Sequence, residues 1–401
     1  MRGLNHVLRF DRDKGQIEVE AGVEWPQLIE YLIQVQAGDW PQWGIIQKQT
    51  GADRLSIGGA LSANIHGRGL ILKPIINDVV SFTLIDGDGK LRTCSRTENR
   101  DLFALSIGGY GLFGIIAGVT LRLMRRRKLE RIVQVRSVDD VMASFDERIR
   151  NGYLYGDFQY SIAAGHDEYL RQGVFSCYRP IDDSTPMPSE QKVLSADDWR
   201  RLYILAHTDP NRGFDEYTRY YSSSSGQLYW SDTHQLSAYV DDYHRRVDEE
   251  LGAKVRGSEM ITEIYVPRDA LTRFLGQVRA DFQQHNVNLI YGTVRLVERD
   301  DESFLAWAKQ PYACVIFNLH VDHDPAGRER AARDFRRLID RGIELDGNYY
   351  LTYHRWAARR QVETCYTQFV DFLKLKKVHD PHERFQSEWY RHYKRMFSED
   401  L

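Results

Sequence analysis

The stretch Leu55-Ser-Ile-Gly-Gly-Ala-Leu-Ser-Ala-Asn-Ile-His-Gly-Arg-Gly-Leu70 collects four glycines and other small residues around one imidazole. Glycine is used where a side chain would collide with a ligand or where a positive φ is required. The run shows neither the alternation of a strand nor a helix-length apolar stripe. It predicts a turn whose backbone lies close to a large ligand, with a purely structural turn as the alternative.

Two further segments follow in an order that narrows the choice of fold. Residues 79–94 read as two strand-like runs joined by Asp-Gly-Asp-Gly, which is a strong hairpin signal. Residues 101–123 pass from a short apolar helix through a glycine-dense turn into a β-branched strand. Each glycine motif is weak alone, but the ordered set is specific.

This ordered set resembles the FAD-binding domain of the vanillyl-alcohol-oxidase and p-cresol-methylhydroxylase (PCMH-type) flavoprotein superfamily. Within it, the sequence looks most like aldonolactone-type oxidases and decaprenylphosphoryl-ribose oxidase. The resemblance covers residues 1–125 well and the remainder in outline. The motifs that carry it are Gly58-Gly-Ala60 with His66-Gly67, Asp86-Gly87, and Leu102-Phe103 through Gly114-Ile-Ile116.

The resemblance implies an α+β protein with a PCMH-type FAD-binding domain and an antiparallel-sheet substrate (cap) domain. We expect the FAD-binding domain at residues 1–125, the cap domain at 126–345, and a C-terminal segment at 346–401 that returns to the flavin site. The pattern after residue 250 agrees, because strands and a helix in this order suit an antiparallel sheet covered by helices. Those elements are expected at 259–267, 269–284, 288–297 and 313–321.

FAD is the cofactor that the resemblance implies, bound between residues 50–70 and 102–118. FMN and NAD are not expected, and no strand-GxGxxG-helix fingerprint with a downstream acidic residue is present. His66 is expected to pack noncovalently against the cofactor, the alternative being a structural turn histidine. The expected cofactor-binding residues are Thr50, Asp53, Ser56, Ile57, Gly58, Gly59, Ala60, Asn64, His66, Gly67, Gly114, Ile115 and Ile116.

Upstream of the strand and helix around Ala21–Leu28, the family usually has a glycine-rich phosphate loop. Here only two predicted strands precede that point. We therefore expect the FAD-binding domain to be incomplete at its N-terminus and to hold FAD weakly, since backbone N–H donors to the pyrophosphate are lost. A family histidine that attaches flavin covalently from that loop has no counterpart here.

Four polar side chains are the expected catalytic residues. Glu263 and Arg295 lie on predicted cap strands, and in the resembling family such residues face the substrate and stabilise reduced anionic flavin. Tyr353 and His354 lie on a predicted strand near the C-terminus, where relatives place proton-handling groups. Alternating strand residues point to opposite faces, so only one of this pair is expected to face the flavin. A surface ion pair for Glu263 and Arg295, and packing roles for Tyr353 and His354, are the alternatives.

Composition excludes several classes of function. The 401 residues are enough for two domains, and 54 Lys and Arg against 57 Asp and Glu give a net charge of −3, so nucleic-acid binding is not expected. The basic run at 122–128 is interpreted as a solvated strand end or linker, with an anionic contact as the alternative. No apolar run approaches the ~18 residues of a membrane span, and four scattered cysteines show no metal-ligand spacing. We therefore expect a cytoplasmic protein without a metal site.

The sequence thus predicts an FAD-dependent oxidoreductase that oxidises a CH–OH group of a sugar, polyol or lactone by hydride transfer to flavin. Its partners would be a small-molecule substrate and an electron acceptor, either oxygen or a carrier. A sterol-type alkene reductase is the alternative within the class. A truncated, flavin-poor relative that acts as a binding or scaffold protein is the alternative outside it. Substrate identity, oxidase or dehydrogenase chemistry, covalent flavin attachment and oligomeric state stay open.

Overall fold

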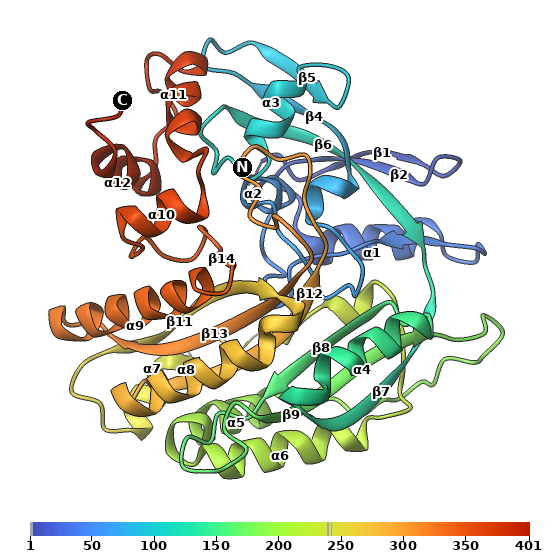
Figure 1. Cartoon of the computed structure of the whole chain (residues 1–401). Coiled ribbons are helices and arrows are strands. Elements are labelled where there is room, and N and C mark those ends of the chain that lie inside the picture. Colours follow the sequence, from blue (N-terminus) through green and yellow to red (C-terminus); the bar gives the residue numbers. More distant parts are fainter. Residues whose placement is uncertain (1–2, 239, 242) are drawn as a thin grey trace.

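The computed structural model describes residues 3–238, 240–241 and 243–401, and it contains two antiparallel sheets (Figure 1). The smaller, six-stranded sheet lies in the N-terminal part and has the order β1-β2-β6-β4-β5, with β3 paired to β6. Its strands are β1 (Val7–Asp11), β2 (Gln16–Glu20), β3 (Trp43–Ile45), β4 (Val79–Ile85), β5 (Leu91–Ser95) and β6 (Ile115–Arg125). Its helices are α1 (Trp25–Val35), α2 (Ile57–Ala63) and α3 (Arg100–Ser106).

The predicted hairpin and the helix-turn-strand segment are both confirmed, as β4–β5 and as α3 followed by β6. The glycine-rich stretch differs from its prediction, because it contains the seven-residue helix α2 rather than only a turn. Ser56 caps this helix by accepting a hydrogen bond from the Gly59 amide at 3.2 Å. Asn64 ends the helix in the left-handed conformation, at φ 47°.

The larger sheet has eight strands in the order β10-β7-β9-β8-β12-β13-β11-β14. Every pairing within it is antiparallel. The strands are β7 (Lys128–Ser137), β8 (Tyr155–Tyr160), β9 (Gln172–Pro180), β10 (Leu228–Trp230), β11 (Gly257–Pro267), β12 (Leu289–Val297), β13 (Tyr312–Asp322) and β14 (Asn348–Tyr349). The predicted α+β class with an antiparallel second sheet is confirmed.

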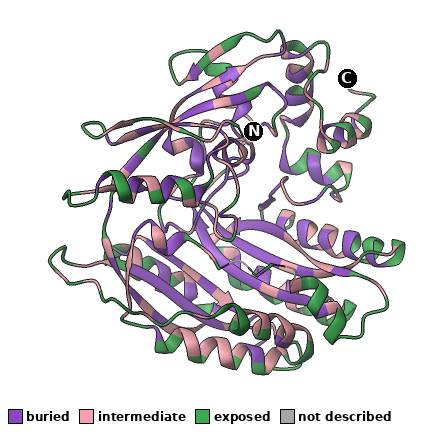
Figure 2. Ribbon diagram, turned by 180° about the vertical axis from the view of Figure 1, so that it is seen from behind, coloured by how far each residue is buried: buried purple, intermediate pink, exposed green. Residues whose placement is uncertain are grey.

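Helices cover the two faces of this sheet differently. On one face, α4 (Val138–Arg150), α8 (Leu271–His285) and α9 (Pro325–Ile343) pack on apolar strand residues. Phe317, for example, contacts Phe274 and Phe282 of α8. Towards the other face, α5 (Ala196–Thr208), α6 (Pro210–Ser223) and α7 (Tyr243–Glu250) contact β7, β9, β11 and β12. Figure 2 shows buried strands between helices whose outer sides are exposed.

The C-terminal helices return to the smaller sheet, as the red segment of Figure 1 shows. They are α10 (Arg359–Cys365), α11 (Phe369–His379) and α12 (Glu388–Met396). Tyr110 stacks on Trp389 with ring centroids 4.4 Å apart, and Phe113 contacts Phe372. The predicted C-terminal strand is short, since only Asn348–Tyr349 pair with β11. Tyr353 and His354 therefore lie in the turn that follows it and not on a strand, which corrects that prediction. Among the described residues, no helix is both long and apolar enough to span a bilayer.

Candidate functional site

Glu263 is the centre of a buried polar group between the two sheets. One carboxylate oxygen lies 2.9 Å from His66 Nε2 and accepts a hydrogen bond from the Tyr265 hydroxyl at 2.7 Å. The other oxygen accepts a hydrogen bond from the Tyr353 hydroxyl at 2.8 Å. Gln49 donates in turn to the Tyr353 oxygen at 2.8 Å. Residues far apart in the sequence therefore meet on one carboxylate.

The local folds around Glu263 explain this meeting. Glu263 and Tyr265 are two residues apart on β11, so both point to the same face of the sheet. Cys314 of β13 pairs with Tyr265 on one side and with Arg295 of β12 on the other, which places all of them on this face. His66 follows the end of α2, and its other ring nitrogen lies 3.1 Å from the Gly67 carbonyl oxygen.

Asn64 holds the turn that presents His66. Its side-chain amide donates to Asp300 at 2.8 Å, and its Oδ1 accepts from the Ile76 amide at 3.2 Å. Its carbonyl oxygen accepts from the Trp307 indole at 3.1 Å. Because Asn64 is fully buried, these bonds tie the end of α2 to the loop after β12.

Electrostatics keep a negative charge on Glu263. Burial alone would raise the pKa of this carboxyl, but the charge and hydrogen bond of His66 outweigh it. Tyr265 and Arg295 act in the same direction, and the pKa of Glu263 falls to about 2. Burial and the Glu263 charge raise the pKa of Tyr353 well above its ordinary value. At neutral pH, therefore, a carboxylate faces a protonated phenol.

Arg295 lies close enough to this carboxylate to lower its pKa, and a second buried cation, Lys48, interacts electrostatically with Arg295. Lys48 is fully buried and pairs with Asp53 at 2.5 Å. Burial lowers the pKa of Lys48, although Asp53 opposes the shift, and the charges of Arg68 and Arg295 lower it further. Arg295 is 5% exposed, and its buried Nε has no hydrogen-bond partner among the described residues. An orphaned guanidinium nitrogen beside further positive charge fits an electron-rich, anionic group such as a reduced flavin ring.

The predicted cofactor-binding residues lie along two segments of the chain, one around α2 and one at the start of β6. The amides of Ile57 and Gly58 donate to the Val23 and Ala21 carbonyls, so hydrogen bonds join the start of α2 to the segment that precedes α1. Asp53 pairs with Lys48 as described. The remaining predicted residues lie along the same two segments: Thr50 is half-buried, Gly59 and Ala60 are in α2, Gly114 precedes β6, and Ile115 and Ile116 begin β6.

Two of the glycines sit where a larger residue would not fit. A Cβ at Gly67 would lie 2.8 Å from the Lys48 carbonyl oxygen. A Cβ at Gly114, whose φ is +152°, would lie 2.6 Å from the Ile85 carbonyl oxygen. Both contacts are with backbone, so part of the glycine pattern reflects close packing of the chain with itself.

His354 is not brought to this group. Its Nε2 lies 3.1 Å from the Thr262 hydroxyl oxygen, on the opposite face of β11 from Glu263. Its ring packs against Phe335 of α9, with centroids 4.5 Å apart, and burial lowers its pKa to about 4. The expectation that only one of Tyr353 and His354 faces the site agrees with this placement.

Several residues of the group were not predicted from sequence: Lys48, Gln49, Tyr265 and Cys314. Tyr265 carried a usable signal, because it stands two residues after Glu263 on a predicted strand. Gln49 and Lys48 had none, since only the folded chain brings them against Tyr353 and Arg295.

His66, Glu263 and Cys314 each offer a ligand atom within 4.8 Å of the others. Both Glu263 oxygens are engaged by hydroxyl groups, and burial raises the pKa of the Cys314 thiol well above its ordinary value. A metal prefers a thiolate to a thiol. We therefore assign this group to proton chemistry.

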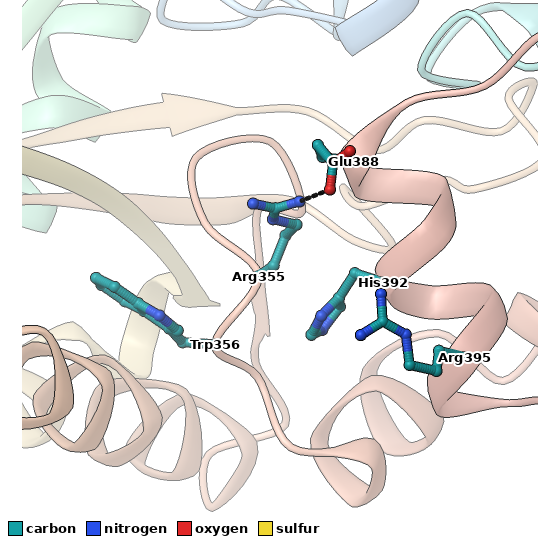
Figure 3. Close-up of a pocket in the computed structure, with 5 residues that line it drawn as sticks. All are labelled: Arg355, Trp356, Glu388, His392 and Arg395. Carbon is teal, nitrogen blue, oxygen red and sulfur yellow. Dashed lines mark ion pairs between the residues drawn. The ribbon is translucent and has the colours of Figure 1, made fainter. Parts of the chain in front are cut away.

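A separate cavity of about 360 Å³ lies near the C-terminus (Figure 3). Its lining is Arg355, Trp356, Glu388, His392 and Arg395, and the Arg355 guanidinium lies 3.9 Å from the Glu388 carboxylate. None of the predicted site residues lines it, so it stands apart from the Glu263 group.

Together, the glycine segments, the two antiparallel sheets and the buried acid-base group define a two-domain flavoprotein. Residues 1–95 match the FAD binding domain family. The chain is 24% identical over 396 residues to L-gulono-1,4-lactone dehydrogenase of Mycobacterium tuberculosis, covering 98% of this chain and 84% of that protein. A solved structure of a solvent-stable cholesterol oxidase superimposes with a TM-score of 0.67 at 14% identity, over 97% of this chain and 84% of that one.

Mouse L-gulonolactone oxidase is 26% identical over 156 residues, so the match spans 39% of this chain and about a third (34%) of that protein. The predicted resemblance is confirmed: residues 1–95 match an FAD binding domain, and the chain is similar to lactone oxidoreductases in sequence and to a cholesterol oxidase in fold. FAD as the cofactor is confirmed with it.

Proposed function

We propose that this chain is an FAD-dependent oxidoreductase that oxidises a CH–OH group of a sugar, polyol or lactone. The observation that carries the proposal is the buried, ionised Glu263, which accepts the Tyr353 hydroxyl beside an unpartnered Arg295 nitrogen. The names of the relatives, which act on L-gulono-1,4-lactone and related lactones, favour a lactone or the corresponding sugar.

The chemistry divides between the cofactor and the chain. Bound FAD would supply the hydride acceptor, held by the segments around α2 and the start of β6. The chain must then take the hydroxyl proton. The Tyr353 residue is half-buried, and its hydroxyl bonds to both Gln49 and Glu263. In the proposed step it takes the substrate proton and passes its own to Glu263.

A carboxylate with a pKa of about 2 is a sufficient proton acceptor here. As hydride leaves the carbon, the hydroxyl becomes the O–H of a protonated carbonyl, which is a far stronger acid than a carboxylic acid. Arg295 contributes positive charge at this carboxylate, and the charge of Lys48 acts on Arg295. We assign them the stabilisation of negative charge that accumulates after hydride transfer.

The electron acceptor and the cellular location are part of the proposal. The relatives include both oxidases and dehydrogenases, so the acceptor is oxygen or a carrier. The four cysteines are free and buried, which suits a reducing compartment such as the cytoplasm.

The test uses the full chain loaded with FAD and offered L-gulono-1,4-lactone, a polyol and a sugar. We expect oxidised product from at least one of them, with hydrogen peroxide if oxygen is the acceptor and reduction of an added dye if a carrier is. Reduction of an isolated alkene, with no CH–OH oxidation, would support the alkene-reductase alternative instead. A protein that takes up no flavin would support the scaffold alternative.

A further inference from the structure

A second histidine-carboxylate cluster lies on the same sheet, outside the site described above. His207 is in the last turn of α5, Glu259 is near the start of β11, and His320 faces Glu259 across the β11–β13 pairing. One Glu259 oxygen lies 3.1 Å from His207 Nε2 and 3.2 Å from His320 Nδ1. One potential ligand atom from each residue lies within 4.8 Å of the other two.

The cluster is buried and incompletely satisfied. The His207 and Glu259 side chains are each 2% exposed, and that of His320 is 13% exposed. The Tyr243 hydroxyl of α7 also lies against this carboxylate, but the second Glu259 oxygen, Oε2, is buried and makes no hydrogen bond of good geometry among the described residues. An unsatisfied buried carboxylate oxygen is costly, and folded proteins rarely leave one without a partner.

The backbone is adapted to the position of the His320 ring. A Cβ at Gly257 would lie 2.1 Å from His320 Cε1, so the imidazole rests directly on the glycine backbone. The Asp322 carboxylate lies 3.6 Å from the other ring nitrogen of His320. A carboxylate behind a histidine is the arrangement that orients metal-binding imidazoles in many proteins.

We propose that His207, Glu259 and His320 bind a divalent first-row transition metal of the zinc class. Two imidazoles and one carboxylate are a donor set that suits Zn²⁺ and leaves a fourth position for water.

The site is distinct from the Glu263 group and needs nothing from it. Glu259 precedes Glu263 by four residues on β11, which is roughly 13 Å along a strand at about 3.3 Å per residue. The metal would join α5 to β11 and β13, and so hold the helical layer of α5, α6 and α7 on the sheet. The proposal stands whether or not the proposed oxidation is correct. No sequence motif predicts this site, because the three ligands are widely separated in the chain.

The experiment strips the 401-residue chain with EDTA and titrates it with Zn²⁺ and Co²⁺. We expect one bound metal per chain after gel filtration, a rise in Tm, and visible Co²⁺ absorption bands of a four- or five-coordinate site. Glu259→Gln and His207→Ala should lose more than the ~10–100-fold in affinity that the loss of an outer-shell partner costs. His323→Ala is the matched control, because His323 directly follows β13 and its ring bonds to Ser258 instead of Glu259.

The outcomes separate the alternatives. If the stripped wild-type chain binds no metal stoichiometrically, the proposal is overturned, and this measurement requires no variant to fold. Equal affinity in wild type, Glu259→Gln and His207→Ala would also overturn it. A Co²⁺–thiolate charge-transfer band would place the metal at Cys314 and overturn the assignment to His207, Glu259 and His320.

Discussion

Glu263 and Glu259 lie on the same face of one strand, yet they meet different surroundings. The partners of Glu263 are hydroxyls and one imidazole, drawn from the first domain and the C-terminal part of the chain. The partners of Glu259 are two imidazoles, one from the helical layer and one from the next strand, together with the Tyr243 hydroxyl of α7. The Tyr353 hydroxyl beside Glu263 can pass a proton to the carboxylate, whereas the two imidazoles beside Glu259 offer lone pairs to a cation. The comparison teaches that the groups around a buried glutamate, rather than the carboxylate alone, decide what it does.

Removing the charge of Glu263 is the change with the largest expected effect. In Glu263→Gln the Tyr353 hydroxyl has no ionised acceptor, so flavin reduction by substrate should slow by about 10²–10⁴-fold. Rapid-mixing absorbance of the bound flavin measures this rate. Glu302→Gln is the control, since Glu302 pairs with Arg96 near the surface. Similar rates in both variants would remove Glu263 from the proton step.

Replacing Gly59 separates flavin binding from proton chemistry. A Cβ at Gly59 would meet side-chain atoms and no backbone, namely Leu55 Cδ1 at 3.1 Å and the capping Ser56 Oγ at 3.2 Å, so the fold should tolerate Gly59→Val. We expect the variant to remain folded and to lose most of its bound FAD, as measured by flavin absorbance per chain. Gly276→Val is the control, because space around Gly276 is open. Full flavin occupancy in Gly59→Val would show that α2 does not face the cofactor.

Asp78 is a third buried carboxylate, and it can be compared with Glu263 and Glu259. Its hydrogen bonds come from neutral amides, those of Gln47 and Asn77. Burial raises its pKa from 3.8 to about 6. Between these values the folded state holds a proton that the unfolded state has lost, so stability falls as pH rises from about 4 to 6. At pH 7 the cost is about 3 kcal/mol.

Asp78→Asn should therefore be more stable than wild type at pH 7 and equal to it near pH 4. Urea unfolding at the two pH values measures the difference. Glu263 provides the opposite sign, because its lowered pKa makes its contribution present above pH 4.5 and lost as pH falls towards 2. A stability gain of Asp78→Asn that did not depend on pH would contradict this reading.

His354 should matter least to the reaction. Its ring lies between Thr262 and Phe335, on the far face of β11 from Glu263. His354→Phe keeps an aromatic ring against Phe335, so the rate of flavin reduction should stay at the wild-type value. A large loss of rate with unchanged flavin content and Tm would return His354 to the catalytic group.

How much the sequence could predict depended on whether a signal was local. Glycines followed by a hairpin and a β-branched strand predicted the first sheet, because turn chemistry is local. The alternation of β11 placed Glu263 correctly on its strand but could not say which face met His66. Helices α5 to α7 were missed, although Ser195 and Asp198 form a capping box at the start of α5. The cluster around Glu259 was beyond prediction, since three separate elements build it.

The most direct test of the central claim follows the bound flavin anaerobically after mixing with L-gulono-1,4-lactone or another accepted alcohol. We predict that the FAD-loaded wild type bleaches, and that deuterium at the oxidised carbon slows it. Tyr353→Phe should keep its FAD but bleach about 100-fold more slowly. Tyr312→Phe, which loses a hydroxyl bonded only weakly to Asp346 at 3.5 Å, should match wild type. Equal bleaching in Tyr353→Phe and wild type, or none with any CH–OH substrate, would contradict the account.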